Sequence, residues 1–206
     1  FADQRVSVLG VNSNVQDSLT ELAAHARIHS IRFPILKDLG NRVADTLGAT
    51  RTPQVFLLDA KRRVRYHGRI DAQFTFGSGV GLAQPVAKRE DLKIALQQLL
   101  KGEPITVPET EAKGCLIGRA RKANSKSRIT YSNQVARIVQ DRCLECHRQG
   151  QIAPFSMEKY DEVAGWGPMI AEVIREQRMP PWHANPQHGK FSNANRLTAK
   201  EKETIY

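Results

Sequence analysis

Two cysteines and a histidine stand close enough in this chain to attach a single cofactor. Cys143, Cys146 and His147 form the pattern C-x-x-C-H. Two thiols three positions apart can form thioether bonds to the vinyl groups on one edge of a haem, and the histidine that follows can ligate the iron. The spacing therefore predicts a covalently bound haem c, with these three residues binding the cofactor and His147 as an iron ligand.

Zinc binding and thiol–disulfide exchange use the same residue types and remain alternatives. A structural zinc site normally takes four Cys or His ligands, often as two pairs, and the chain has no second cysteine pair. A redox-active C-x-x-C usually opens a helix, whose N-terminus lowers the thiol pKa. Here the motif instead closes the amphipathic segment 131–141. Both observations favour the haem interpretation.

A methionine downstream of the motif is expected to supply the second axial iron ligand. Met179 is followed directly by two prolines, which fix their own φ and keep Met179 out of helical geometry. A stiff loop would therefore present its thioether. His183 and His188 are the rival ligands, whereas the other two methionines fall in helix-like segments and are expected to fill the core.

From residue 131 onward the chain resembles a small class I-like cytochrome c domain. A helix over 131–141 precedes the motif, and two short helical stretches, around 157–163 and 168–176, follow it. In such cytochromes the sixth ligand is commonly a Met on a Pro-bearing loop, which is what the resemblance implies for Met179. The resemblance also implies an all-α fold and electron transfer through iron.

The last ten residues begin another helix. Thr198 and Glu201 have the spacing of a capping box, and Tyr206 falls only two turns later. At the other end, Phe1 is not an initiator methionine, and no signal peptide is visible within the sequence. We expect the sequence to be a fragment of a longer bacterial multi-domain protein.

The first hundred residues alternate between strand-like and helix-like segments. Helical spacing of apolar residues marks the helices, and short apolar runs mark the strands. The expected order is strand, helix, extended segment, short helix, hairpin and helix, with the main segments at 5–11, 17–28, 33–38, 52–59, 64–67 and 90–100.

That order resembles the thioredoxin fold of redoxin and peroxiredoxin-like proteins, over about residues 1–102. The phrases that carry the resemblance are Val-Asn-Ser-Asn (11–14), Phe-Pro-Ile-Leu-Lys-Asp (33–38), Gly-Ala-Thr-Arg-Thr-Pro (48–53), Val-Phe-Leu-Leu-Asp (55–59) and Tyr-His-Gly-Arg-Ile-Asp (66–71). In that family a Thr-Pro pair carries a cis proline beside the reactive cysteines. The resemblance thus implies a cis Thr52–Pro53 bond and assigns Thr52 and Pro53 to the side where a thiol substrate would bind.

The reactive cysteine of redoxins has no counterpart before position 115. Residues 1–114 contain no cysteine, and the helix that carries it in redoxins would precede Phe1. Cys115 could be a buried small residue, a partner for a cysteine outside this sequence, or a reactive thiol. The catalytic residues are therefore unknown. A thiol–disulfide oxidoreductase or peroxidase with an upstream cysteine stays an alternative, as does a catalytically inactive docking module.

Positive charge is concentrated between the two expected domains. Residues 113–130 carry six Lys or Arg and no acid, which is +6 of the net +10. Ser and Gly lie among these charges and no aromatic residue accompanies them, so a solvated linker that contacts haem propionates or an acidic redox partner is favoured over nucleic-acid binding. No run of 18 apolar residues predicts a membrane span.

The sequence thus predicts two domains joined by a linker. We expect an α/β thioredoxin-like domain over 1–112 that lacks its first elements, a basic linker over 113–130, and an all-α haem domain over 131–206 that is incomplete at its C-terminus. Haem attachment through thioethers takes place outside the bacterial cytoplasmic membrane, so the expected location is periplasmic or otherwise extracytoplasmic. The expected role is electron transfer through haem iron.

Overall fold

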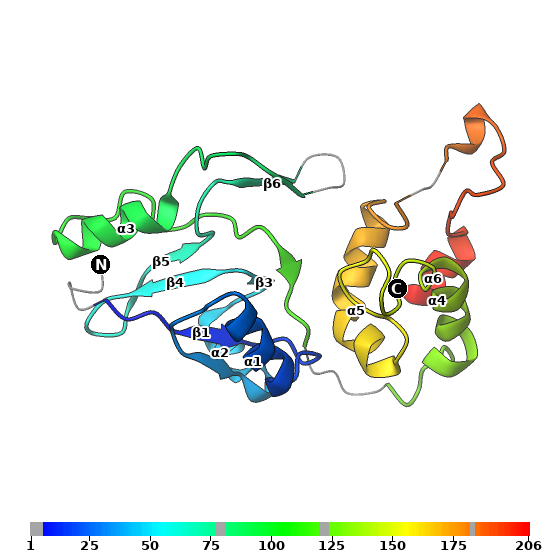
Figure 1. The fold of residues 1–206 in the computed structure, drawn as a ribbon, viewed down its shortest axis with the longest axis horizontal. Coiled ribbons are helices and arrows are strands. Elements are labelled where there is room, and N and C mark those ends of the chain that lie inside the picture. Colours follow the sequence, from blue (N-terminus) through cyan, green and yellow to red (C-terminus); the bar gives the residue numbers. More distant parts are fainter. Residues whose placement is uncertain (1–5, 77–80, 120–123, 182–183) are drawn as a thin grey trace. The chain divides into compact units, whose positions relative to one another are not determined.

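The chain divides into two compact units, residues 1–119 and 120–206. The computed structural model describes residues 6–76, 81–119, 124–181 and 184–206. In Figure 1 the first unit runs from blue to green and the second from yellow-green to red. The division falls inside the segment 113–130 that the sequence marks as a linker, and the exact domain boundaries stay predictions.

The first unit mixes short strands with helices (Figure 1). Its helices are α1 (Leu19–Ile28), α2 (Arg42–Leu47), which follows a 3-10 turn at Leu39–Asn41, and α3 (Asp91–Leu100). Its strands are β1 (Gly10–Asn12), β2 (Ile35–Lys37), β3 (Arg51–Thr52), β4 (Val55–Leu58), β5 (Val64–Gly68), β6 (Phe74–Phe76), β7 (Gly81–Ala83) and β8 (Cys115–Leu116). β1 pairs with β2 in parallel, while β4–β5, β6–β7 and β3–β8 are antiparallel pairs. This mixed α/β arrangement is consistent with a thioredoxin-like fold.

Local sequence signals account for the helix ends in this unit. Ser18 and Glu21 form a capping box at the start of α1, which satisfies backbone N–H groups that have no partner inside the helix. Gly48 ends α2 in the left-handed conformation, where glycine carries no steric penalty. The hairpin β6–β7 was not expected from the sequence, because its strands are only three residues long and show no clear alternation.

A buried carboxylate holds the turn after β2. Asp38 is 6% exposed and accepts hydrogen bonds from Ser13 Oγ at 2.9 Å and from the backbone N–H groups of Val43 and Ala44, each at 3.0 Å. Burial acts to raise the pKa of Asp38, but these hydrogen bonds outweigh it and hold the pKa below its usual value. The ionised side chain thus ties the end of β1 to the start of α2.

The segment after residue 112 is not a free linker throughout, which corrects the sequence interpretation for residues 113–119. β8 pairs with β3, and the N–H of Gly118 donates to Asn14 Oδ1 at 3.0 Å while its carbonyl accepts from Val15 N–H at 3.1 Å. Ile117 is 7% exposed and packs with Ala44 and Ala49 in the small core of this unit. The short apolar run 115–117 therefore joins the first unit, a signal that the surrounding basic residues obscured.

The second unit is helical. A π-helical turn (Tyr131–Val135) leads into α4 (Ala136–Arg142), followed by α5 (Tyr160–Arg175), a 3-10 turn (Pro186–His188) and α6 (Ala199–Ile205). The expected capping box at Thr198 and Glu201 is confirmed at the start of α6. The core joins α4, α5 and the segment before α6 through seven buried apolar side chains: Ile138, Val139, Met157, Val163, Ile170, Ile174 and Leu197.

The two short helices expected around 157–163 and 168–176 are in fact one helix, so that expectation was wrong. α5 runs through Pro168 without a break, although proline removes a hydrogen bond and crowds the preceding turn. Val163, Ile170 and Ile174 are buried on one face of α5, at a spacing of seven and four residues. A continuous helix buries all three, and this burial outweighs the local preference of proline.

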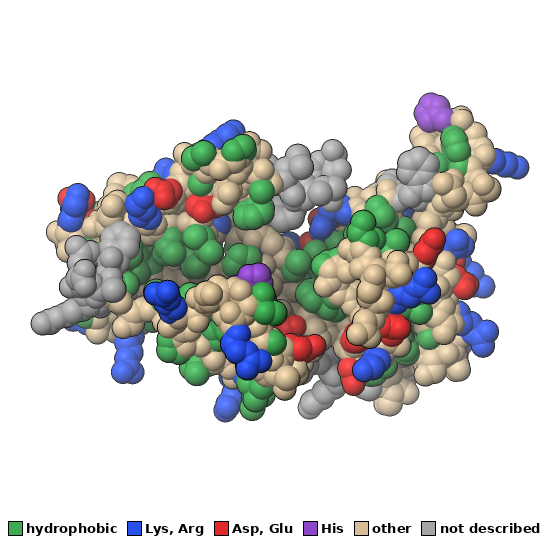
Figure 2. Space-filling model, viewed as in Figure 1, with side chains coloured by type: hydrophobic (Ala, Val, Ile, Leu, Met, Phe, Trp, Pro, Cys, Tyr) green, Lys and Arg blue, Asp and Glu red, His purple; other side chains and the backbone are tan. Residues whose placement is uncertain are grey.

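Both units expose some apolar side chains, which are green in Figure 2. On the paired strands β1 and β2, Val11 and Leu36 lie opposite each other and are 39% and 54% exposed. None of the helices in the described part of the chain is long and apolar enough to cross a membrane.

Replacing Asp38 by Asn should destabilise the first unit. An amide has one acceptor oxygen in place of two, so at least one buried donor loses its partner, which costs about 1–3 kcal/mol. The parent should also lose the contribution of ionised Asp38 as the pH falls below about 4, because its folded-state pKa is lowered. Urea unfolding of parent and variant as a function of pH measures both changes in stability. Hydrogen exchange of the Val43 and Ala44 amides shows whether these two donors have lost their partner.

The matched control is Asp45→Asn in α2. The Asp45 side chain is 62% exposed and pairs with Arg119, so its loss should cost less than about 1 kcal/mol. Equal protection of the Val43 and Ala44 amides in the Asp38 and Asp45 variants would show that the buried carboxylate does not hold this turn.

Candidate functional site

The three motif residues lie on one tight turn at the end of α4. Cys143 is the C-cap of α4, and its carbonyl oxygen accepts hydrogen bonds from the N–H groups of Cys146 and His147, at 3.2 and 2.9 Å. Ile138 and Val139 are buried in the core and hold α4 in place. The motif is therefore a closed turn fixed to the apolar interior of the second unit.

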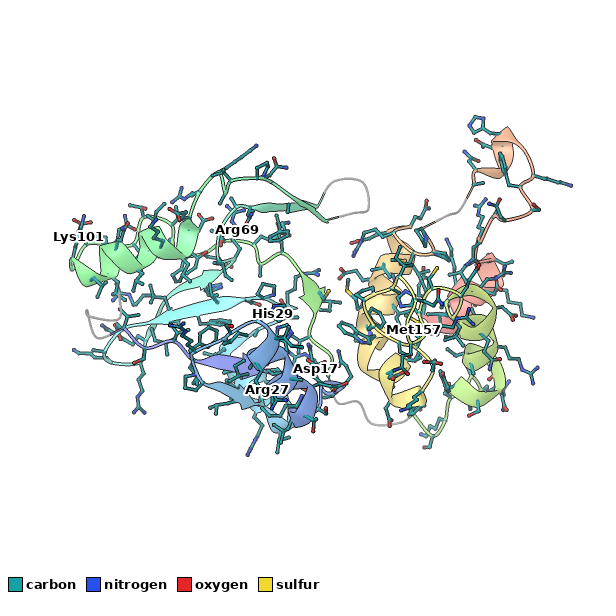
Figure 3. The ribbon with its side chains drawn as sticks, in the orientation of Figure 1. Asp17, Arg27, His29, Arg69, Lys101 and Met157 are labelled. Carbon is teal, nitrogen blue, oxygen red and sulfur yellow. The ribbon has the colours of Figure 1, made fainter. Side chains whose placement is uncertain are left out.

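The loop that follows the motif folds back onto it. The N–H of Ala153 donates to the carbonyl of Cys146 at 3.2 Å, and the N–H of Met157 donates to the carbonyl of His147 at 2.8 Å. Met157 is 5% exposed and lies within the second unit, as its label in Figure 3 shows. These bonds satisfy backbone groups of the motif and leave its side chains to make other contacts.

The surroundings of His147 favour one tautomer of its neutral ring. The side chain is 7% exposed, and its Nδ1 lies 3.1 Å from the carbonyl oxygen of Phe155. A carbonyl oxygen only accepts, so Nδ1 carries the proton and the neutral ring keeps its lone pair on Nε2. Burial lowers the pKa of His147, while the Phe155 hydrogen bond acts in the opposite direction. A neutral imidazole with a free Nε2 is the form that binds metals.

Aromatic rings support this arrangement. The His147 and Phe155 ring centroids lie 4.7 Å apart, and the Phe155 ring stacks on Trp166 of α5 at 4.5 Å. Sequence reasoning missed Phe155, because its contribution to His147 is a backbone carbonyl and no side-chain pattern marks it. Phe155 and Trp166 therefore act as positioning residues for the His147 ring.

The Cys143 thiol differs from the reactive thiol of a thiol–disulfide exchange site. Burial raises the pKa of the Cys143 thiol to about 11, whereas exchange needs a thiolate. Cys143 also sits at the C-terminal end of a helix, where the helix dipole disfavours negative charge. Both cysteines are unpaired in the structure. This environment does not activate Cys143 as a nucleophile.

The zinc alternative also lacks support in the described part of the chain. Within those residues no three or more His, Cys, Asp or Glu side chains gather in a group that could hold a metal ion. A structural zinc site needs four such ligands. Two thiols and a buried imidazole on one turn are the residue types that covalent haem attachment uses, and haem binding by Cys143, Cys146 and His147 stays a prediction.

Met179 lies at a small cavity beyond the end of α5. Its backbone N–H donates to the carbonyl of Val173 at 3.2 Å, and its side chain is 38% exposed. The cavity measures about 30 Å³, and the residues that line it are Ile174, Gln177, Met179, Pro180, Arg196, Leu197 and Lys202. Its lining includes neither His147 nor the motif cysteines. Met179 as sixth ligand stays a prediction.

Neither histidine that rivals Met179 as the second iron ligand gains support from the described residues. His188 lies in the exposed 3-10 turn Pro186–His188. His183 falls outside the described residues.

In the first unit, the Thr52–Pro53 bond is cis, which confirms the expected geometry. Thr52 on β3 lies opposite Cys115 on β8. Gly114 has a φ of +143°, and a Cβ there would come within 2.2 Å of the Thr52 carbonyl oxygen, so only glycine permits this close pairing. The structure thus brings Cys115 beside the Thr-Pro pair, which sequence reasoning had treated separately. Their role toward a thiol substrate stays a prediction.

Comparison with known proteins covers mainly the first unit. The family model described as the AhpC/TSA family matches residues 1–67, while no curated protein matches the chain. One similar solved structure is a hypothetical protein from Sinorhizobium meliloti 1021, with 31% identity and a TM-score of 0.50 over 59% of this chain and 66% of that one. Another is an uncharacterized conserved protein from Geobacillus kaustophilus, with 25% identity and a TM-score of 0.48 over 59% of this chain and 64% of that one.

The chain spans just under two thirds of the length of either solved protein. The family match covers α1, α2, β1 to β4 and all but the last residue of β5. The part of the chain at residues 1–67 is therefore an AhpC/TSA domain, of the thioredoxin-like redoxin type.

Proposed function

We propose that the second unit attaches one haem c and transfers single electrons, as part of an extracytoplasmic redox protein. The observation that supports this most directly is the buried, neutral His147, held by Phe155 immediately after the two motif cysteines. A thiol–disulfide site does not call for this combination, and a structural zinc site would need a fourth ligand beside the two cysteines and His147. When bound, haem supplies a one-electron carrier at this position.

The residues of the motif divide the work of binding. Cys143 and Cys146 would each form a thioether, which consumes both thiols. His147 offers Nε2 to the iron, and its hydrogen bond to Phe155 orients the ring and increases its basicity as a ligand. The apolar core around α4 and α5 would exclude water from the haem. This environment would favour the oxidation state of the haem that carries the smaller net charge.

Met179 completes the proposed ligand set. A Met/His pair raises the reduction potential relative to other axial pairs. It also leaves no open position on the iron, so electron transfer fits better than peroxide or oxygen chemistry. The basic segment around Lys126 and Arg128, both exposed, would suit a redox partner with an acidic surface.

A second candidate function is thiol chemistry in the first unit, and the AhpC/TSA match over residues 1–67 favours it. A thiol–disulfide oxidoreductase or peroxidase would need a reactive cysteine upstream of Phe1, because residues 1–114 contain none. The haem unit would then carry electrons to or from that thiol. Reading the encoded residues upstream of Phe1 for C-x-x-C separates this function from an inactive docking module.

Replacing the motif cysteines should remove haem attachment one bond at a time. In a host that matures c-type cytochromes, Cys143→Ser or Cys146→Ser should leave a single thioether, and the double variant none. The pyridine haemochrome spectrum should shift stepwise from a c-type toward a b-type position. A matched Cys115→Ser variant should keep the parent spectrum. A b-type spectrum from the parent protein would contradict the proposal.

Replacing Met179 should open the iron and lower its reduction potential. The oxidised parent should show a weak absorption band at the red end of the spectrum that reports iron–sulfur bonding, and Met179→Ala should abolish it. We expect the potential to fall by on the order of 0.1–0.3 V, a fraction of the roughly 0.8 V that axial ligands span. Met169→Leu, a volume-conserving change on α5, is the control. An unchanged band and potential in Met179→Leu would assign the position to another ligand.

The chain as given should show no thiol-based turnover. Thiolate attack starts both disulfide and peroxide reduction, and Cys115 is the only thiol left once Cys143 and Cys146 are thioethers. One thiol cannot complete a cycle of oxidation and reduction without a resolving partner. Insulin reduction and peroxide consumption should both stay at the buffer rate. A rate well above buffer that disappears in Cys115→Ser would make Cys115 the reactive residue.

A further inference from the structure

Two histidines outside the haem unit form a second set of metal-ligating side chains. His25 lies on α1, and His29 is the C-cap residue that follows it. The N–H of His29 donates to the carbonyl of His25 at 3.0 Å, so the two residues are one helical turn apart. Their ring centroids are 4.2 Å apart at an angle of 45°. Figure 3 labels His29 at the end of α1.

The distance between the rings suits joint binding of one ion. An imidazole nitrogen binds a transition metal at about 2.0–2.1 Å. When the two metal–nitrogen bonds meet at a right angle, the ring centroids lie roughly 4.5 Å apart. The observed centroid separation of 4.2 Å is close to that value. Both residues are exposed, and in the described part of the chain no hydrogen bond or ion pair engages either ring.

We propose that His25 and His29 chelate a divalent ion of the late first transition series, with Cu²⁺ bound most tightly. Imidazole suits Cu²⁺, Ni²⁺ and Zn²⁺, and the stability order of these ions places Cu²⁺ first. Histidines four positions apart on a helix place both rings on one face, the arrangement that the H-E-x-x-H motif uses for zinc. Hard ions such as Mg²⁺ and Ca²⁺ prefer oxygen ligands and should not bind here.

The site supplies two protein ligands, and water completes the coordination. Glu21 lies one turn before His25, but its Oε2 accepts from Ser18 in the capping box, and no third ligand group gathers there among the described residues. An open, two-ligand site exchanges its ion with solvent, unlike a closed structural zinc site. It therefore accepts an ion from solution and releases it again, rather than contributing to folding.

Calorimetric titration with Cu²⁺ tests the proposal on the full chain with all thiols alkylated. Alkylation removes Cys115 and any unattached motif thiol as competing ligands, so the outcome does not depend on whether haem is present. We expect one tightly bound Cu²⁺ per chain. Either His25→Gln or His29→Gln should weaken binding roughly 100-fold, because the second imidazole then no longer adds its high effective concentration.

His67→Gln is the matched control, since His67 is a single, partly exposed imidazole on β5. It should leave Cu²⁺ affinity unchanged, and Mg²⁺ should give no binding heat in any variant. Three results would each overturn the proposal: no tight Cu²⁺ site in the parent, unchanged affinity in both single variants, or an equal loss in His67→Gln.

Discussion

The hydrogen bond between His147 Nδ1 and the carbonyl oxygen of Phe155 is the interaction on which the proposed haem site of the second unit depends. At 3.1 Å it fixes the tautomer and the direction of the ring, and burial keeps the ring neutral. Without it the lone pair on Nε2 would have no defined direction. The turn around Cys143 and the stacking of Phe155 on Trp166 hold the two partners of that bond in place. The backbone turn at Cys143, the His147 ring and the Phe155 carbonyl thus form a single preorganised unit.

Sequence reasoning worked best where one residue type has one local role. The capping box at Thr198 and the amphipathic helix α3 follow rules that act within a few turns, and each is present. The motif at Cys143 is likewise visible because its spacing is local. Haem is not part of the polypeptide, so the spacing of the motif implies haem binding but does not demonstrate it.

The expectations that were wrong concern interactions between distant segments. Pro168 suggests a helix break, but burial of Val163, Ile170 and Ile174 favours one helix. The basic residues around 113–119 suggest a linker, but Ile117 and the pairing of Cys115 with Thr52 join this segment to the first unit. In the same way, Phe155 acts on His147 through its backbone, which carries no sequence signal. Tertiary packing decided all three cases.

The most direct measurement is the intact mass of the denatured parent chain after expression in a host that matures c-type cytochromes. Denaturation releases a haem held only by ligation, whereas a haem held by thioethers to Cys143 and Cys146 stays with the polypeptide. We expect one population, heavier than the polypeptide by the mass of one haem. A chain of unmodified mass from such a host would contradict it, because the preorganised turn at His147 would then serve some other purpose.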